Sequence, residues 1–320
     1  MEIRLAGHGR GTHRRYHRSH MLDVIRKPFV IPAVVCVAVI VVVLVLDFDP
    51  IVNGHPSYLV FYLGFLLISV LALAWAVWKR DSRGRLWLSV PGGVALILVA
   101  VGAWLIAPFA ATDVALDAMV STPDVTVTSS ASSITLEPQG SVSGVGLVFQ
   151  PGARVDARAY AHILRPLAEE GHRVVIVKQP LGVDFFASGF AGSWADQNPE
   201  TEWAVGGHSL GGVVASLNVA DDGDLDRLVL WASFPPSDIS DTAGLDVVSV
   251  YGTTDGLSTP DDVRASAPDL PEETVFVPVE GAVHSHFGDY GEQPGDGEPG
   301  TSRTEAQEDI VAATLAFLAG

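Results

Sequence analysis

A serine flanked by two glycines at a spacing of two residues dominates the chemistry that this sequence can perform. In the stretch 207–211, GHSLG, the serine has the G-x-S-x-G spacing of a nucleophile at a sharp strand-to-helix turn. Such a turn strains the serine backbone and crowds the positions two residues away, and glycine relieves both. The apolar AVGG before it predicts a strand, and VVASLNVA after it predicts a helix whose N-terminus favours developing negative charge. We therefore predict Ser209 as a nucleophile for acyl transfer; the alternative is a glycine-rich turn without chemistry.

An acid and a histidine should follow the serine in chain order if the three form a triad. Asp255 comes directly after a predicted strand, in YGTTDG, where an ordinary D-G turn is the other interpretation. Asp261 and Asp262 are weaker candidates because they begin the next helix and would cap it. His284 and His286 both follow the last predicted strand. We favour His284 as the general base, oriented by the acid, and keep His286 as the alternative base or as a residue lining the site.

Two backbone N–H groups are needed to stabilise the oxyanion of the tetrahedral intermediate. One is expected from Leu210, directly after the nucleophile. The other should come from the turn 151–153 after an earlier strand. Proline has no N–H, so Gly152 or Ala153 must donate, and we favour Ala153. The alternative for this Pro-Gly turn is a simple strand exit.

A substrate pocket can be built only from short segments, because the sequence has no long insertion for a lid. The stretch 180–199 contains Phe185 and Phe186, which would form either an apolar wall over the site or part of the core. Trp231, at the end of another predicted strand, is expected to flank the same pocket. The sequence has one cysteine, Cys36, which excludes a cysteine-based metal cluster, and we predict neither a metal nor an organic cofactor.

These residues must be positioned by alternating strands and helices. Continuous apolar runs predict strands at 145–149, 173–178, 202–206, 225–231, 245–251 and 273–279, with helices at 157–170, 210–220 and 304–318. Such a pattern is typical of a mostly parallel, doubly wound α/β sheet covered on both faces. We place this domain at 144–320 and a linker with a short β-hairpin at 112–143.

The first third of the chain has the character of a membrane anchor. Hydrophobic residues make up 48% of the sequence and the mean hydropathy is +0.33. Three long apolar runs, at about 29–46, 58–78 and 86–111, predict three transmembrane helices within residues 28–111. Basic residues concentrate in the tail 1–27 and in the connection 79–85, which places both in the cytoplasm. Three crossings then put the hydrolytic domain outside the cell membrane.

Charge is divided unevenly along the chain. Residues 1–110 carry 11 basic and 5 acidic residues, a balance of 11 − 5 = +6, whereas the remainder carries 8 basic and 32 acidic residues, a balance of 8 − 32 = −24. A surface this negative argues against nucleic acid as a partner. Many carboxylates and only three lysines are typical of halophilic proteins.

Three stretches resemble the α/β-hydrolase superfamily, near its dienelactone-hydrolase branch. They are FQPGARVDARAYAHILRPLAEEGHRVVIVKQPLGV, VGGHSLGGVVA, and VYGTTDGL followed by EGAVHSHFGDYGEQPGDG. The resemblance implies the α/β-hydrolase fold, the triad Ser209, Asp255 and His284, and hydrolysis of a carboxylic ester or related acyl bond. The chain departs from true dienelactone hydrolases in having serine instead of cysteine as nucleophile, which leaves the substrate open.

Four functional hypotheses follow from these patterns. The leading one is an outward-facing serine esterase that acts on a small-molecule or lipid ester and contacts membrane lipid through three spans. A lipase or thioesterase acting on membrane lipid is the second, and a non-catalytic binding or sensory module that keeps the fold is the third. The fourth, a transporter, is disfavoured because the apolar runs hold almost no charged residue to line a path.

Overall fold

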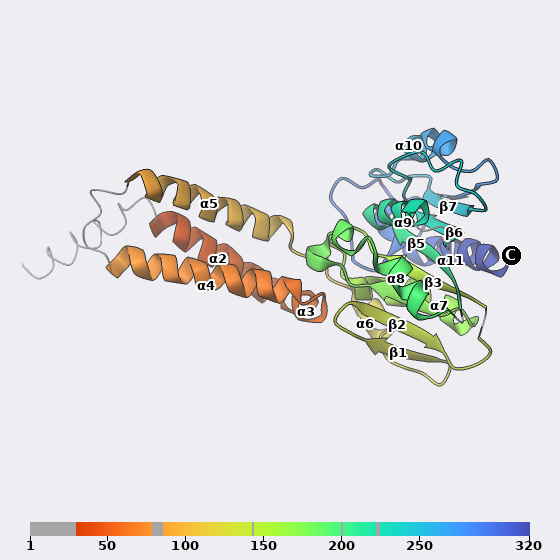
Figure 1. Ribbon diagram of the computed structural model, residues 1–320, viewed down its shortest axis with the longest axis horizontal. Helices are drawn as coiled ribbons and strands as arrows, with labels where there is room; N and C mark the ends of the chain where they lie inside the picture. Colours follow the sequence, from red (N-terminus) through yellow and green to blue (C-terminus); the bar gives the residue numbers. More distant parts are fainter. Residues whose placement is uncertain (1–29, 79–85, 143, 200, 222–224) are drawn as a thin grey trace, which may run out of the picture. The chain divides into compact units, whose positions relative to one another are not determined.

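The computed structural model describes residues 30–78, 86–142, 144–199, 201–221 and 225–320 (Figure 1). The chain divides into two compact units, one made of Met1–Phe48 with Leu59–Ala107 and the other of Asp49–Tyr58 with Pro108–Gly320. The basic tail predicted at 1–27 and the basic connection predicted at 79–85 lie outside the described residues.

In the described part of the first unit there are three apolar helices: α2 (Val30–Leu46), α4 (Ser57–Trp78) and α5 (Leu86–Leu105). Small side chains line their contacts, with Ala33 and Cys36 fully buried on α2 and Ala103 on α5. The Tyr62 hydroxyl on α4 donates to the Ala103 carbonyl at 2.8 Å, and the Ser69 hydroxyl donates to the Cys36 sulfur at 3.2 Å. Small residues and polar contacts of this kind are how helices associate in lipid.

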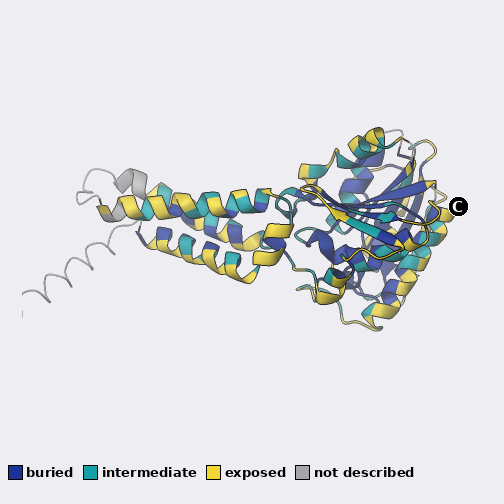
Figure 2. Cartoon of the chain, turned by 90° about the horizontal axis from the view of Figure 1, so that it is seen from below, coloured by how far each residue is buried: buried dark blue, intermediate teal, exposed yellow. Residues whose placement is uncertain are grey.

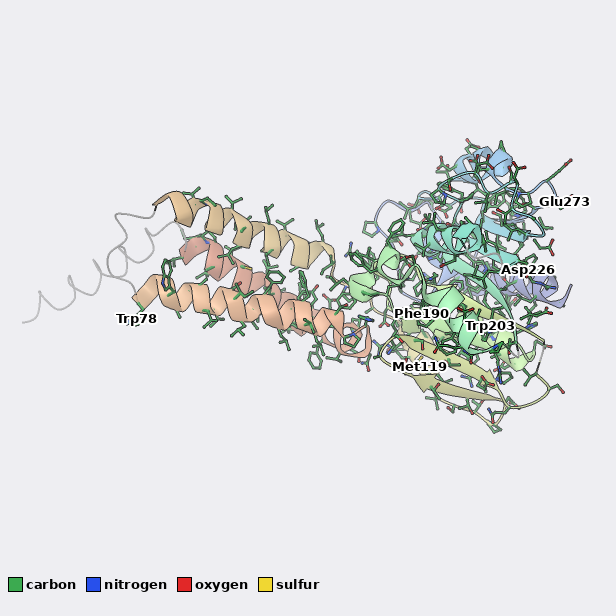
Figure 3. The ribbon with its side chains drawn as sticks, in the orientation of Figure 1. Trp78, Met119, Phe190, Trp203, Asp226 and Glu273 are labelled. Carbon is green, nitrogen blue, oxygen red and sulfur yellow. The ribbon has the colours of Figure 1, made fainter. Side chains whose placement is uncertain are left out.

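Many positions on these helices are exposed, coloured yellow in Figure 2, and they include large apolar residues. Examples are Val45 at 71%, Val60 at 74% and Trp78 at 85% exposure, the last labelled in Figure 3. By length and composition one described helix could cross a membrane, over Ser57–Trp75 with hydropathy 2.2, and shorter apolar helices cover Val30–Leu46 and Val90–Leu105. Helix α5 ends at Leu105 and not at the predicted residue 111, because Pro108 disfavours helical geometry before it and has no N–H to continue the helix.

The connection between α2 and α4 belongs to the second unit, where the sequence predicted only a short loop. It contains the helix α3 (Phe48–Asn53). The Asp49 carboxylate accepts a 2.6 Å hydrogen bond from the Arg158 guanidinium, and the Ser57 hydroxyl accepts one of 2.9 Å from the backbone of Leu181. These residues are therefore structural parts of the α/β unit.

An eight-stranded mixed sheet forms the centre of the second unit. Its strands are β1 (Val125–Ser129), β2 (Ser133–Pro138), β3 (Val145–Gln150), β4 (Val174–Val177), β5 (Glu202–His208), β6 (Arg227–Trp231), β7 (Asp246–Gly252) and β8 (Val275–Val279). The order is β1-β2-β4-β3-β5-β6-β7-β8, antiparallel from β1 to β4 and parallel from β4 to β8. The mostly parallel sheet expected from the sequence is confirmed.

The β1–β2 hairpin extends this sheet, although the sequence analysis assigned it to a separate linker. Strand β2 pairs with β4, with Ile134 opposite Ile176. Both side chains are fully buried, as is Leu136. The alternating apolar residues of the hairpin are therefore buried against the helix layer, and β4 gains a partner on its otherwise open edge.

Helices cover both faces of the sheet (Figure 1). On one face, α7 (Ala161–Glu169) and α11 (Arg303–Ala319) pack against side chains such as Leu147 and Phe149. On the other, α8 (Phe190–Gln197) and α9 (Leu210–Asp221) pack against side chains such as Val148. Shorter elements complete the unit: α6 (Asp113–Asp117), α10 (Pro260–Ala265), and the 3₁₀ helices η1 (Ala157–Tyr160), η2 (Pro180–Gly182), η3 (Asp184–Ala187), η4 (Ala267–Asp269) and η5 (His284–Phe287).

Candidate active site

Ser209 lies at the turn between β5 and α9, and its backbone is strained. Its φ angle is +53°, a left-handed value that non-glycine residues adopt rarely. The turn is held by a hydrogen bond from the Ser209 N–H to the Trp231 carbonyl at 3.0 Å. The Ser233 hydroxyl also donates to the Ser209 carbonyl at 2.7 Å. This conformation is the one predicted from the GHSLG spacing.

Neighbouring atoms lie so close to the backbone around the serine that several positions there must be glycine. A Cβ added at Gly207 would collide with the backbone of Gly211, and one added at Gly211 would collide with the carbonyl of Gln150. At Gly212 an added Cβ would lie 2.5 Å from the Ser233 side chain. Helix α9 can therefore begin directly above the end of β3 only because these positions carry no side chain.

Asp255 and His284 form a buried hydrogen-bonded pair. The Nδ1 atom of His284 lies 2.8 Å from Oδ2 of Asp255, and their side chains are 1% and 0% exposed. The other carboxylate oxygen accepts backbone N–H groups from Leu257 and Ser258, each at 2.8 Å, which fixes the orientation of the acid. Asp255 follows β7 and His284 follows β8, so both lie at the same sheet edge as Ser209.

Asp296 joins the two loops that carry this pair, and the sequence analysis did not identify it. Its carboxylate accepts backbone N–H groups from His284 at 2.9 Å, Ser285 at 2.8 Å, Gly297 at 2.8 Å and Gly256 at 3.4 Å. Burial alone would raise the pKa of Asp296, but these four donors lower it below its ordinary value. Asp296 is therefore an ionised bridge between the Asp255 loop and the His284 loop.

Arg303 supports the same loop from the start of α11. Its guanidinium donates to the carbonyl oxygens of Ser285 and Gly288, and to that of Gly291 at 2.9 Å. The Gln307 amide, one turn further along α11, donates to the His286 carbonyl at 3.2 Å. The segment that carries both histidines is thus fixed through its backbone by one helix.

The turn expected to supply an oxyanion donor is anchored through Tyr160. The Gly152 N–H donates to the Tyr160 hydroxyl at 2.8 Å, and that hydroxyl lies 2.8 Å from Nδ1 of His208. Because its N–H is used in this way, Gly152 is not available to an oxyanion. The backbone N–H groups of Ala153 and Leu210 have no acceptor among the described residues. The structure thus leaves open the two donors that the sequence analysis favoured.

His208 is a buried neutral histidine beside the proposed base. Its ring stacks on Phe287 at 5.8 Å and lies 4.5 Å from the His284 ring, measured between centroids. Burial, with a smaller effect of His284, lowers the pKa of His208 well below its ordinary value. Burial likewise raises the pKa of Tyr160 well above its ordinary value. The neutral hydroxyl accepts from Gly152 and so has its proton free to donate to His208 Nδ1.

One of the predicted pocket residues does not lie as expected. Trp231 is fully buried, with its indole N–H donating to the Thr314 hydroxyl at 3.0 Å, so the prediction that it flanks a pocket is wrong. The reason is that its ring points into the helix-covered core and contacts Phe149 at 4.7 Å between centroids. Phe185 and Phe186 are 49% and 67% exposed on η3, which excludes the alternative that they are part of the core, and Phe186 is among the residues that line a cavity of about 350 Å³.

His286 is buried in η5, and it is His284 that makes the bond to Asp255. Burial, followed by the charge of Arg303, lowers the pKa of His286. Of the weaker acid candidates, Asp262 forms a capping box with Thr259 at the start of α10 as expected, whereas Asp261 pairs with Arg264. The geometry thus favours His284 and Asp255 over their rivals.

A buried carboxyl group, Asp184, lies next to the oxyanion turn and was also missed by sequence reasoning. Its side chain is hydrogen-bonded to the Gln179 amide, which also donates to the Pro151 carbonyl at 2.8 Å. Burial raises the pKa of Asp184 well above its ordinary value. No short motif identifies Asp184, because Gln179 links it to the Pro151 carbonyl only in the folded chain.

A cavity of about 720 Å³ lies away from this site. It is lined by residues at the beginnings of β6, β7 and β8, such as Arg227, Asp246 and Val275, and by the end of α11. That is the opposite edge of the sheet from Ser209. Among the described residues, no group of three or more His, Cys, Asp or Glu side chains is arranged to hold a metal.

A match to a protein-family model supports the fold. A model of the alpha/beta hydrolase family matches residues 146–308, which confirms the superfamily expected from the elbow and histidine stretches. No curated protein matches the chain in sequence. A putative dienelactone hydrolase from Klebsiella pneumoniae is similar in structure at 17% identity, covering 61% of this chain and 98% of its own, with a TM-score of 0.46. The protein TT1662 from Thermus thermophilus is similar at 15% identity, covering 61% and 99%, also with a TM-score of 0.46.

Proposed function

We propose that this chain, which belongs to the alpha/beta hydrolase family, is a membrane-anchored serine hydrolase that cleaves a carboxylic ester or related acyl bond. The observation that carries the proposal is the buried 2.8 Å hydrogen bond between Asp255 and His284 at the strand ends next to the strained Ser209 elbow. A buried acid–histidine pair beside a serine held at positive φ is the arrangement that acyl transfer requires.

The proposed mechanism assigns one task to each group. His284 removes the proton from the Ser209 hydroxyl as the oxygen attacks the acyl carbon, and Asp255 orients the imidazole and stabilises its charged form. The backbone N–H groups of Leu210 and Ala153 bind the developing oxyanion. His284 then donates this proton to the leaving oxygen as the intermediate collapses, which releases the alcohol and leaves an acyl-serine. Water hydrolyses the acyl-serine, with His284 taking the proton of the water and returning it to the Ser209 oxygen.

The assay compares the full-length chain in phosphatidylcholine nanodiscs with its Ser209→Ala variant on short p-nitrophenyl esters. We expect turnover in the parent and its loss in the variant, with fluorophosphonate labelling only in the parent. Equal rates in the two proteins would remove Ser209 as nucleophile. A folded parent with neither turnover nor labelling would support the alternative, a non-catalytic binding or sensory module of the same fold.

For the anchor, we propose that α2, α4 and α5 all cross the membrane, with the hydrolase unit outside the cell. The small inward and large outward side chains of these helices support contact with lipid. A topological argument adds to this, because residues 49–58 and 108–320 belong to one unit. If α4 crosses the bilayer, the chain must cross again before residue 108 to return to that side, and α5 is the apolar helix between them.

Topology can be tested with single cysteines in a Cys36→Ser background. Cysteines at Gly140 and Gly189, glycines whose added Cβ would meet no atom within 4 Å, should react with an impermeant maleimide in intact cells. A cysteine at Ser82, in the predicted cytoplasmic connection, should react only after lysis. Labelling in the reverse pattern would place the hydrolase unit in the cytoplasm.

A lipid ester is the second candidate substrate class, and the exposed phenyl rings of Phe185 and Phe186 favour it. An enzyme that takes substrate from lipid should prefer long acyl chains and should lose that preference when both rings are replaced by serine. Preference for short soluble esters in parent and variant alike would favour a soluble substrate.

A further inference from the structure

We propose that a cavity beside the oxyanion turn binds the anionic end of the substrate, a carboxylate or phosphate group carried on an apolar chain. This inference rests on the proposed hydrolase function and specifies its substrate class. The cavity, which we call the Lys178 pocket, has a volume of about 350 Å³ and includes Lys178, His55, Trp194, Phe186 and Phe190 in its lining. That size is within the usual range for small-molecule sites.

The ammonium group of Lys178 has a proton to offer to a ligand. It donates to the Ser129 hydroxyl at 2.8 Å and to the Ser130 carbonyl at 2.9 Å, which uses two of its three protons. No carboxylate of the described residues lies within 4.0 Å of it, although the residue is only 6% exposed. A buried ammonium group with one unused proton is a binding group for an anion.

His55 provides a second donor from the connection between α2 and α4. Its Nδ1 atom is hydrogen-bonded to the Ser57 hydroxyl at 2.9 Å and accepts the Ser57 backbone N–H at 3.2 Å. The Ser57 hydroxyl accepts from Leu181, so its own proton points to the His55 ring. Burial, and then the charge of Lys178, lowers the pKa of His55, so the neutral ring carries its proton on Nε2. Nε2–H has no acceptor among the described residues.

Trp194 provides a third donor and an apolar surface. Its indole N–H is buried and has no hydrogen-bond partner within the described part of the chain. Its ring stacks on Phe190, labelled in Figure 3, with centroids 5.8 Å apart and planes at 16°. A buried donor without an acceptor costs free energy unless a ligand supplies one, whereas the stacked rings suit an alkyl or aryl group.

The charge of the pocket is opposite to that of its surroundings. Residues 112–320 carry 32 acidic and 8 basic side chains, yet no Asp or Glu is among the described residues that line the cavity. Three donors without a carboxylate acceptor select for an oxyanion. A cationic or neutral polar ligand would leave the Lys178 charge uncompensated.

Hydrogen bonds connect the pocket to the reaction site. The residue after Lys178, Gln179, donates to the Pro151 carbonyl at 2.8 Å, and Arg154 donates from its backbone to the Gly182 carbonyl at 2.9 Å. Both bonds join the segment that lines the pocket to the turn that carries Ala153. Lys178 follows β4 and Ser209 follows β5, with only β3 between these strands in the sheet, so the proposal places the acyl carbon at Ser209 and the far end of the same substrate in the Lys178 pocket.

The test uses matched esters that differ only in charge. Mono-p-nitrophenyl esters of succinic, adipic and suberic acid are compared with the corresponding methyl diesters, using the full-length chain in phosphatidylcholine nanodiscs. We expect at least one anionic ester to be preferred in kcat/KM by about tenfold, the value of one charge-assisted hydrogen bond. Lys178→Gln should abolish this preference, so that the anionic and neutral esters are hydrolysed with similar kcat/KM, and Lys178→Arg should retain it.

Arg264→Gln is the matched control, because it removes one exposed charge on α10 that is paired with Asp261. It should keep the anionic preference. Adding phosphatidylglycerol to the nanodiscs distinguishes two sources of the oxyanion: inhibition that depends on Lys178 indicates a lipid headgroup, and no inhibition indicates a free substrate.

Two results would overturn the proposal. One is the absence of anionic preference at every chain length while neutral esters are hydrolysed, and the other is a preference that survives Lys178→Gln. If neither ester class is hydrolysed by the parent, the proposed function itself fails, and the pocket proposal with it.

Discussion

The carboxylate of Asp296 accepts a 2.9 Å hydrogen bond from the backbone N–H of His284. Asp296, in the segment between η5 and α11, thereby holds the segment that carries the proposed base. The same carboxylate reaches Gly256, next to the proposed acid Asp255, so one charged group sets the distance between two loops.

Asp296→Asn should weaken this bridge, because an amide offers one acceptor oxygen where the carboxylate offers two. We expect kcat to fall by about tenfold, with Ser209 still labelled by fluorophosphonate. The pKa of Asp296 is lowered in the folded protein, so its contribution to the free energy of unfolding is present at neutral pH and is lost as the pH falls through that lowered pKa. The difference in Tm between parent and variant should therefore shrink in acid; a difference that stays constant with pH would contradict this role.

Asp255→Asn should reduce kcat by a factor of about 10³ to 10⁴ with little change in KM, because an amide can hold His284 in the wrong tautomer. His286→Asn is the matched comparison, since that histidine lies in the same 3₁₀ helix and does not contact the acid. We expect it to keep most of its activity. A larger loss in His286→Asn than in His284→Asn would exchange the two assignments.

Tyr160→Phe should leave the Gly152 N–H without an acceptor in a buried site. We expect a loss of stability of about 1–3 kcal/mol, measured by chemical denaturation. We also expect a fall in kcat that exceeds any change in KM, because the turn that carries Ala153 is no longer fixed. Unchanged kcat would show that the turn is held without the tyrosine.

Arg158→Met and Asp49→Asn should differ in their cost to stability. The Arg158 guanidinium contacts Asp156, whose side chain is 1% exposed, and Asp49, whose side chain is 61% exposed. Removing the cation leaves a buried carboxylate unpaired and should cost about 3 kcal/mol or more. Asp49→Asn removes one exposed partner and should cost less than about 1 kcal/mol. Equal losses would contradict the proposed difference in burial.

The successful predictions depended on patterns within short stretches of the sequence. The Ser209 elbow depends on glycines within a few residues, and the strands were visible as apolar runs, so both could be predicted. Asp255 was identified by chain order and by its place after a strand, and the pairing with His284 agrees with that reasoning. Chain order alone could not choose between His284 and His286, because a single turn of 3₁₀ helix decides which ring faces the acid.

Non-local contacts account for what was missed. Tyr160 and His208 are 48 positions apart in the chain, and Asp296 contacts Gly256 across 40 positions, so no spacing rule connects them. Trp231 was misplaced because a residue at the end of a strand can point to either face of the sheet, and only packing against Phe149 and α11 decides which.

The position of Asp49–Tyr58 within the hydrolase unit has a consequence for biosynthesis. This segment is translated before α4 and α5, yet the surface it packs on is made last. The unit can be completed only after both intervening helices have been synthesised and have brought the chain back to Pro108. Cleavage of the chain just before Pro108 would release a fragment without this segment, in which Arg158 would keep Asp156 but lose Asp49, and the Leu181 N–H would lose Ser57.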